Sequence, residues 1–145
     1  MDKIKEFLLS AKRKTYSGDG AEGPPSRPGS HDLMHEDGEL KYIDSYFGGS
    51  KFCGEEALYK DNVPIWSMNY YGRVLDDLFN GDFLKESLQF GSVDMPYRGP
   101  KIYRSNGYEY LCTVEGDFSF FYGHEEIFKN GKKVYQCLFH GGEVI

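Results

Sequence analysis

Two Asn-Gly pairs constrain the fold of this chain more than any other feature of its sequence. They stand at Asn106-Gly107 and Asn130-Gly131, each between two runs rich in apolar residues. A type I′ turn needs positive φ at both central residues, so Asn-Gly between such runs predicts a tight β-hairpin. A further hairpin is expected over residues 52–72, with its turn around Lys60 to Val63. Antiparallel hairpins should therefore dominate the fold.

Alternation of side chains with a period of two indicates which strand residues face inward. In "KYIDSYFGG" the alternation places Tyr42, Asp44 and Tyr46 on one face of a half-buried strand. In "WSMNYYGR" it places Trp66 and its alternate neighbours in the core and the intervening polar residues on a wet face. The stretch "GDFSFFYGHEE" supplies a further strand, with a β-bulge expected at Gly123.

Helical periodicity appears in two places. Residues 2–14 predict an amphipathic N-terminal helix. Residues 74–90 predict a second helical region that Gly81 interrupts. Its expected buried side chains are Leu75, Leu78, Phe79, Phe83, Leu84 and Leu88. We therefore predict an α+β fold, a twisted antiparallel sheet built from hairpins with both helices packed on one face, and a single domain over residues 1–145.

A polar segment at about residues 14–38 contains few residues that could be buried in a core. Loops of this length in compact domains are usually functional or disordered. Its glycines around Asp19 could approach an anion closely, and its arginine Arg27 could grip phosphate or carboxylate. Three alternatives stay open: a lid that contacts a ligand, a loop packed over the domain, and a disordered segment.

Composition excludes some classes of function. The net charge of −6 argues against nonspecific nucleic-acid binding, which requires basic clusters. Three widely spaced cysteines do not indicate a disulfide scaffold or a zinc site, and we expect them to be free thiols in a reducing compartment. Neither a signal peptide nor an apolar run of the roughly 20 residues that cross a bilayer is apparent, so a cytoplasmic protein without membrane contact is expected.

Several distinctive stretches carry a resemblance to a known family. These are "AKRKTYSGDG", "PPSRPGSHDL", "KYIDSYFGG", "PIWSMNYYGRVL", "MPYRGP" and "CLFHGG". Together they resemble an uncharacterised bacterial family catalogued as a domain of unknown function, number 5680, some of whose members form the C-terminal part of helix-turn-helix regulators. The resemblance supplies no catalytic residue that could be carried over to this chain. It implies that the polar segment is part of the domain.

The leading functional hypothesis is a non-catalytic binding domain for a small anionic or nucleotide-like ligand, acting as a sensor or sequestering protein. The site would lie where the polar segment folds over the open sheet face. Arginines would grip negative charge, and tyrosines would stack on the ligand or donate to it. The expected binding residues are Arg13, Lys14, Tyr16, Arg27, Asp32, Tyr46, Asn69, Tyr71, Arg73 and Arg98.

Two other classes of function stay open. A small hydrolase or transferase would use His140 with Glu56 or Glu126 as acid and base. A protein-interaction module would present a Tyr-rich open face to a partner or to a second copy of the chain. Neither a metal nor a cofactor is expected, and His31 and His35 with Asp32 or Glu36 give only a weak signal for metal binding. One glutamate of each pair, Glu55-Glu56 and Glu125-Glu126, is expected to face inward and pair with Arg73, Arg98 or Arg104.

Overall fold

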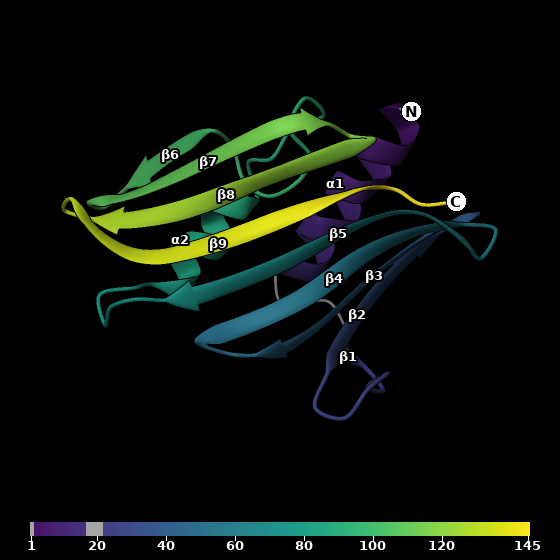
Figure 1. Ribbon diagram of the computed structural model, residues 1–145, viewed down its shortest axis with the longest axis horizontal. Coiled ribbons are helices and arrows are strands. Elements are labelled where there is room, and N and C mark those ends of the chain that lie inside the picture. The colour runs from purple at the N-terminus through teal and green to yellow at the C-terminus, as the bar shows by residue number, and fades with distance from the viewer. Residues whose placement is uncertain (1, 17–21) are drawn as a thin grey trace.

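A computed structural model describes residues 2–16 and 22–145 of the chain (Figure 1). Two helices lie on one side of a single antiparallel sheet of nine strands. The helices are α1 (Asp2–Tyr16) and α2 (Gly81–Leu88). The strands are β1 (Glu22–Gly23), β2 (His31–Asp37), β3 (Leu40–Gly48), β4 (Lys51–Lys60), β5 (Val63–Val74), β6 (Ile102–Ser105), β7 (Tyr108–Asp117), β8 (Phe120–Lys129) and β9 (Lys132–Glu143). The predicted α+β class is confirmed.

The sheet consists of two meanders that meet along one seam. Its strand order is β1-β2-β3-β4-β5-β9-β8-β7-β6, so the seam joins β5 to β9. Both predicted Asn-Gly turns are confirmed, with φ of 52° and 80° at Asn106 and Gly107 and 49° and 85° at Asn130 and Gly131. The β4–β5 turn is also confirmed, and there Asp61 and Asn62 adopt positive φ without a glycine.

The helices differ in how well the sequence predicted them. Helix α1 buries Phe7, Leu8 and Ala11 against the sheet, as its periodicity indicates. Helix α2 is shorter than predicted because Asn80 caps it, its side chain accepting from the backbone N–H groups of Asp82 and Phe83. The preceding residues are therefore not helical, and the predicted buried positions Leu75 and Leu78 are exposed.

The prediction of one loop over residues 14–38 is wrong. Its first residues, Lys14–Tyr16, belong to α1, and its later residues form β1 and β2. The glycines around Asp19 lie outside the described residues. The predicted bulge at Gly123 is also wrong, because the register of β8 and β9 shifts between Ile127 and Phe128 instead.

The two faces of the sheet have different environments. One face, which we call the helix-covered face, carries Trp66, Met68 and Tyr70 of β5, all buried as predicted. The opposite face, which we call the open face, carries the alternate residues of the same strand, including the exposed Tyr71. Since antiparallel partners directly opposite each other share a face, the register places every strand residue on one face or the other.

Glycines on the helix-covered face leave room for aromatic rings. A Cβ on Gly54 would lie 2.6 Å from the Cζ atom of Tyr70 and from the Cβ atom of Tyr46. A Cβ on Gly72 would meet the Phe52 ring, with its Cε1 atom at 2.8 Å and its Cζ atom closer still. Only a residue without a side chain lets these rings lie directly on the backbone of β4 and β5. The rings therefore form part of the surface that faces the helices.

Candidate functional site

A cleft of about 490 Å³ opens between the helix-covered face and the two helices. Strands β3 to β5 contribute its floor, and α2 and the end of α1 contribute its walls. Its apolar lining is supplied by Leu33, Phe52, Val74, Phe79, Leu84 and Leu88. Its polar lining is supplied by Thr15, Tyr16, Glu22, Asp44, Tyr46, Tyr70, Lys85, Arg98 and Tyr135. A concave site with apolar walls and a few convergent polar groups is the usual form of a small-molecule site.

The first charged residue of the floor is Arg98, which forms an ion pair with Glu125 beneath the cleft. The Arg98 guanidinium donates to Glu125 Oε1 from Nη2 at 2.6 Å and from Nε at 3.1 Å. Both side chains are buried, at 4% and 0% exposure. The Tyr135 hydroxyl donates to the same carboxylate at 2.7 Å, and the Tyr110 hydroxyl donates to its second oxygen. This charge and these hydrogen bonds hold the pKa of Glu125 below its usual value although burial raises it.

The second ion pair comes from a lysine in the buried stripe of α1. Lys12 Nζ lies 3.1 Å from Glu56 Oε1, and Lys12 also donates to the backbone oxygen of Tyr97. The hydroxyl of Tyr16 donates to Glu56 at 3.1 Å and accepts from Arg98 at 3.2 Å, so it links the two ion pairs. Burial lowers the pKa of Lys12, an effect that Glu56 opposes.

A third carboxyl, Asp44, lies directly across the strands from Glu56. It is 2% exposed and accepts from the Tyr70 hydroxyl at 2.6 Å. Burial and, second, the charge of Glu56 raise the pKa of Asp44 to about 7. Within residues 2–16 and 22–145 no lysine, arginine or histidine forms an ion pair with Asp44. The buried floor thus holds three carboxyl groups and two cations.

The raised pKa of Asp44 predicts a pH-dependent contribution to stability. Because the native pKa of about 7 exceeds the value of 3.8 that an unperturbed aspartate has, the native state binds more protons between these values, and the contribution of Asp44 falls as pH rises through this window. In Asp44→Asn this position has no carboxyl group that titrates. We therefore expect its free energy of unfolding, relative to the unmodified protein, to increase with pH up to about 7, as measured by urea denaturation across the window.

Asp32→Asn is the matched control for this measurement. Asp32 lies on the open face, and hydrogen bonds from Ser30 and Ser26 hold its pKa below the usual value. Its contribution is therefore present at neutral pH and is lost only as pH falls below about 4. A relative stability of Asp44→Asn that is flat over the window in which Asp32→Asn is also flat would contradict the raised pKa of Asp44.

Three of the predicted binding residues lie in the cleft. Tyr16, Tyr46 and Arg98 line it. Arg13 lies beside it at the end of α1, where its guanidinium donates to the backbone oxygens of Gln89 and Gly91 at 3.3 Å and 3.0 Å. Lys14 is exposed in the same helical turn.

The remaining predicted binding residues lie on or beside the open face. Asn69, Tyr71 and Arg73 alternate along β5, and the Arg73 side chain donates to the Tyr71 hydroxyl at 3.2 Å. Arg27 lies 4.7 Å from the centre of the Phe47 ring on the same face, and Asp32 lies on that face of β2. The sheet separates these residues from the cleft. The four arginines predicted to converge therefore do not form one anion site.

The predicted acid–base pairs are likewise separated. His140 lies opposite Asn69 on the open face, whereas Glu56 is buried on the helix-covered face. Glu126 shares the open face but is engaged with Lys133, whose Nζ atom lies 2.8 Å from its carboxylate. The prediction that one glutamate of each adjacent pair faces inward is confirmed for Glu56 and Glu125, and the Arg98 partner of Glu125 is confirmed as well.

The histidines considered as metal ligands lie in β2, not in a loop as predicted. His31 stacks on Tyr46 and its Nδ1 atom lies 2.8 Å from Glu22, whereas His35 stacks on Phe7. In the described part of the chain no group of three or more His, Cys, Asp or Glu residues could hold a metal ion.

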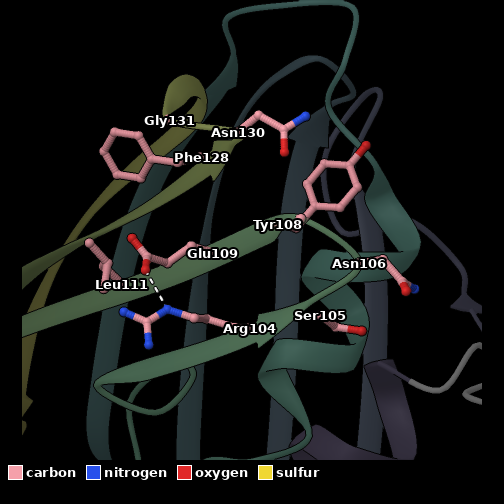
Figure 2. A pocket seen from close by; sticks show the side chains of 10 residues that line it. Arg104, Ser105, Asn106, Tyr108, Glu109, Leu111, Phe128, Asn130 and Gly131 are labelled. Atoms are coloured by element: carbon pink, nitrogen blue, oxygen red, sulfur yellow. Dashed lines mark hydrogen bonds and ion pairs between the residues drawn. The ribbon is translucent and has the colours of Figure 1, made fainter.

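A second hollow of about 710 Å³ lies at the far edge of the sheet, beside the β6–β7 and β8–β9 turns. Figure 2 shows Arg104 and Glu109 joined by an ion pair there, with Leu111 and Phe128 beside them. The Arg104 side chain is 70% exposed. Solvent therefore competes for the polar groups of this hollow, and the cleft beneath the helices is the better candidate site.

Sequence reasoning missed two of the buried polar residues of the site, Asp44 and Lys12. Asp44 was predicted to share a face with Tyr42 and Tyr46, but it was not recognised as part of the site. Lys12 was not singled out, although it follows Leu8 by four residues on the buried side of α1. At both residues the available signal was a charged side chain at a position that the periodicity assigns to the buried side.

Comparison with protein families places most of the chain in one of them. Residues 44–144 match the family described as "Domain of unknown function (DUF5680)". No curated protein and no solved structure matches the chain. Within the described residues, neither helix is long and apolar enough to cross a membrane.

Proposed function

The chain belongs to the DUF5680 family of domains of unknown function, and we propose that it is a non-catalytic binding domain for a small molecule held in the cleft of the helix-covered face. The observation that carries this proposal is a cleft of about 490 Å³ whose apolar walls meet a buried, hydrogen-bonded polar floor. Burying charges is costly, so a buried polar floor beside an open cleft supports a role beyond packing.

The size and lining of the cleft favour a ligand with a planar ring. Rings of Phe52, Tyr70 and Tyr135 border it, and aromatic surfaces of this kind pack against a nucleobase or another flat group. These rings support the part of the hypothesis that concerns the flat base of a nucleotide-like ligand. Its anionic part loses support, because the four arginines on which it rested lie in separate places.

The proposed setting is the bacterial cytoplasm, where the domain would act as a sensor or a sequestering protein. Its cysteines are consistent with a reducing compartment, since Cys53, Cys112 and Cys137 are all free thiols. Burial raises the pKa of Cys112 and of Cys137 to about 12, so both are unreactive as thiolates. Association into homo-oligomers is part of the same proposal, with no residue assigned to it.

Backbone amide NMR during a fragment screen tests the binding function. We expect fragments with one aromatic ring to shift the amide signals of cleft residues such as Thr15, Gly49 and Leu84. Leu84→Trp fills the cleft from the wall that α2 provides, and should weaken the fragments that bind there by about tenfold or more, a loss of about 1.4 kcal/mol in binding free energy.

Leu138→Trp provides the matched control, because Leu138 is 65% exposed on the open face. This variant should leave the affinities of the fragments unchanged. A screen whose hits shift only open-face residues such as Tyr71 would place the site on the other side of the sheet and contradict the proposal. A screen with no hits at all would contradict it as well.

A further inference from the structure

The charges beneath the cleft leave one carboxyl group without a cation of its own. Arg98 is paired with Glu125 at 2.6 Å, and Lys12 with Glu56 at 3.1 Å. Both cations lie near enough to Asp44 to favour its ionised form, yet within the described residues neither forms an ion pair with it. Asp44 borders the cleft, whereas Glu56 and Glu125 do not. The unbalanced carboxyl is therefore the one that a ligand can reach.

The lining around Asp44 is aromatic. Six rings border the cleft, those of Tyr16, Tyr46, Phe52, Tyr70, Phe79 and Tyr135. The electron-rich faces of such rings attract cations, most strongly where water is excluded. A carboxylate set among aromatic rings is the combination that recognises an ammonium group.

The groups at the rim carry charges of both signs, so the preference rests on the floor of the cleft. Glu22 lines the opening on one side, and it lies 2.8 Å from the Nδ1 atom of His31. Lys85 is the exposed cation of the lining on the α2 side. An anion that entered the cleft would meet Asp44 on the floor, and the Arg98 guanidinium already donates to Glu125 and Tyr16. An ammonium group would instead supply the cation that Asp44 lacks.

We propose that the cleft binds an organic cation, a protonated amine or quaternary ammonium group carried on an aromatic or apolar body, with Asp44 as its counter-ion. The Tyr70 hydroxyl positions the Asp44 carboxyl, and the surrounding rings contact the body of the ligand. This inference rests on the proposed binding function and adds the charge of the ligand to it.

Three compounds of similar size and different charge test the inference by isothermal titration calorimetry. 2-Phenylethylamine is a cation, 2-phenylethanol is neutral and phenylacetate is an anion at neutral pH. We expect the amine to bind about tenfold or more tightly than the alcohol, and the anion to bind least tightly. Asp44→Asn should reduce the preference for the amine over the alcohol to about threefold or less, because it removes the charge but keeps the shape.

Asp32→Asn is the control, since it removes the same charge from the open face and should leave the preference intact. Circular dichroism shows whether each variant is folded. If Asp44→Asn does not fold, the preference of the unmodified protein for the amine over the alcohol still decides the question.

The possible outcomes distinguish a failure of the cation inference from a failure of the proposed binding function. Equal or tighter binding of the alcohol or the anion, with amide shifts in the cleft, overturns the cation inference and leaves the binding function standing. A preference for the amine that survives in a folded Asp44→Asn also overturns it. If none of the three compounds binds but other fragments occupy the cleft, the cation inference alone fails. If no fragment occupies the cleft, both proposals fail.

Discussion

Arg98→Met is expected to lower the free energy of unfolding by about 3–5 kcal/mol, the cost of leaving a buried charge without its partner. The variant removes the cation from Glu125, a carboxylate that is fully buried and that Tyr110 and Tyr135 still contact. Methionine fills part of the volume, so the loss arises mainly from the unpaired charge. Urea denaturation followed by circular dichroism measures it.

Arg104→Met provides the matched control for this variant. Arg104 and Glu109 are also 2.6 Å apart, but the arginine is 70% exposed, so the loss should be about 0–1 kcal/mol. The double variant Arg98→Met, Glu125→Gln should recover much of the stability of Arg98→Met, because glutamine carries no charge but still accepts hydrogen bonds. Equal losses for Arg98→Met and Arg104→Met would show that burial does not determine the strength of the Arg98 pair.

Gly54→Ala has the second largest expected effect, and it acts on stability and on the site together. The added methyl group would lie 2.6 Å from the Cζ atom of Tyr70 and from the Cβ atom of Tyr46, so at least one ring must move. Overpacking of this kind costs about 1–3 kcal/mol of unfolding free energy. Displacing Tyr70 also breaks its 2.6 Å hydrogen bond to Asp44, so fragment binding in the cleft should weaken.

Gly23→Ala serves as the control for the added methyl group. Its Cβ would have no neighbour closer than the Asp32 backbone oxygen at 3.8 Å, an ordinary contact. Thermal denaturation and the amide shifts of bound fragments should both be unchanged in this variant. If Gly54→Ala behaves as Gly23→Ala does, the ring of Tyr70 is not held against β4 in the way the cleft requires.

The parts of the fold that local chemistry determines could be predicted from the sequence. The Asn-Gly turns were correct because few residue pairs adopt positive φ at two consecutive positions so readily. The inward side of β5 was correct because alternation alone assigns Trp66, Met68 and Tyr70 to one face. Strand β2 was missed because Leu33 alternates with His31 and His35 on one face, so apolar alternation is absent, and tertiary contacts such as Phe7 on His35 stabilise it instead.

The site could be predicted only in part, because pairing between distant residues is not visible in a single sequence. Glu125 was expected to be a structural carboxylate with Arg98 among its possible partners, and this was correct. The tyrosines were expected mainly on the open face, whereas Tyr110 and Tyr135 are buried and hydrogen-bond to Glu125. Local alternation shows which residues share a face, but it does not show which face the helices cover.

The seam between β5 and β9 has a consequence for the order of folding. Every other pairing in the sheet joins strands that follow one another in the chain, so each meander can form from local contacts. The seam must close over the whole segment between Val74 and Lys132, and such closure is slower than local hairpin formation. Asp44 and Glu56 belong to the first meander and Glu125 to the second. The polar floor is therefore complete only when the two halves meet, because Arg98 joins Tyr16 of α1 to Glu125 of the second meander.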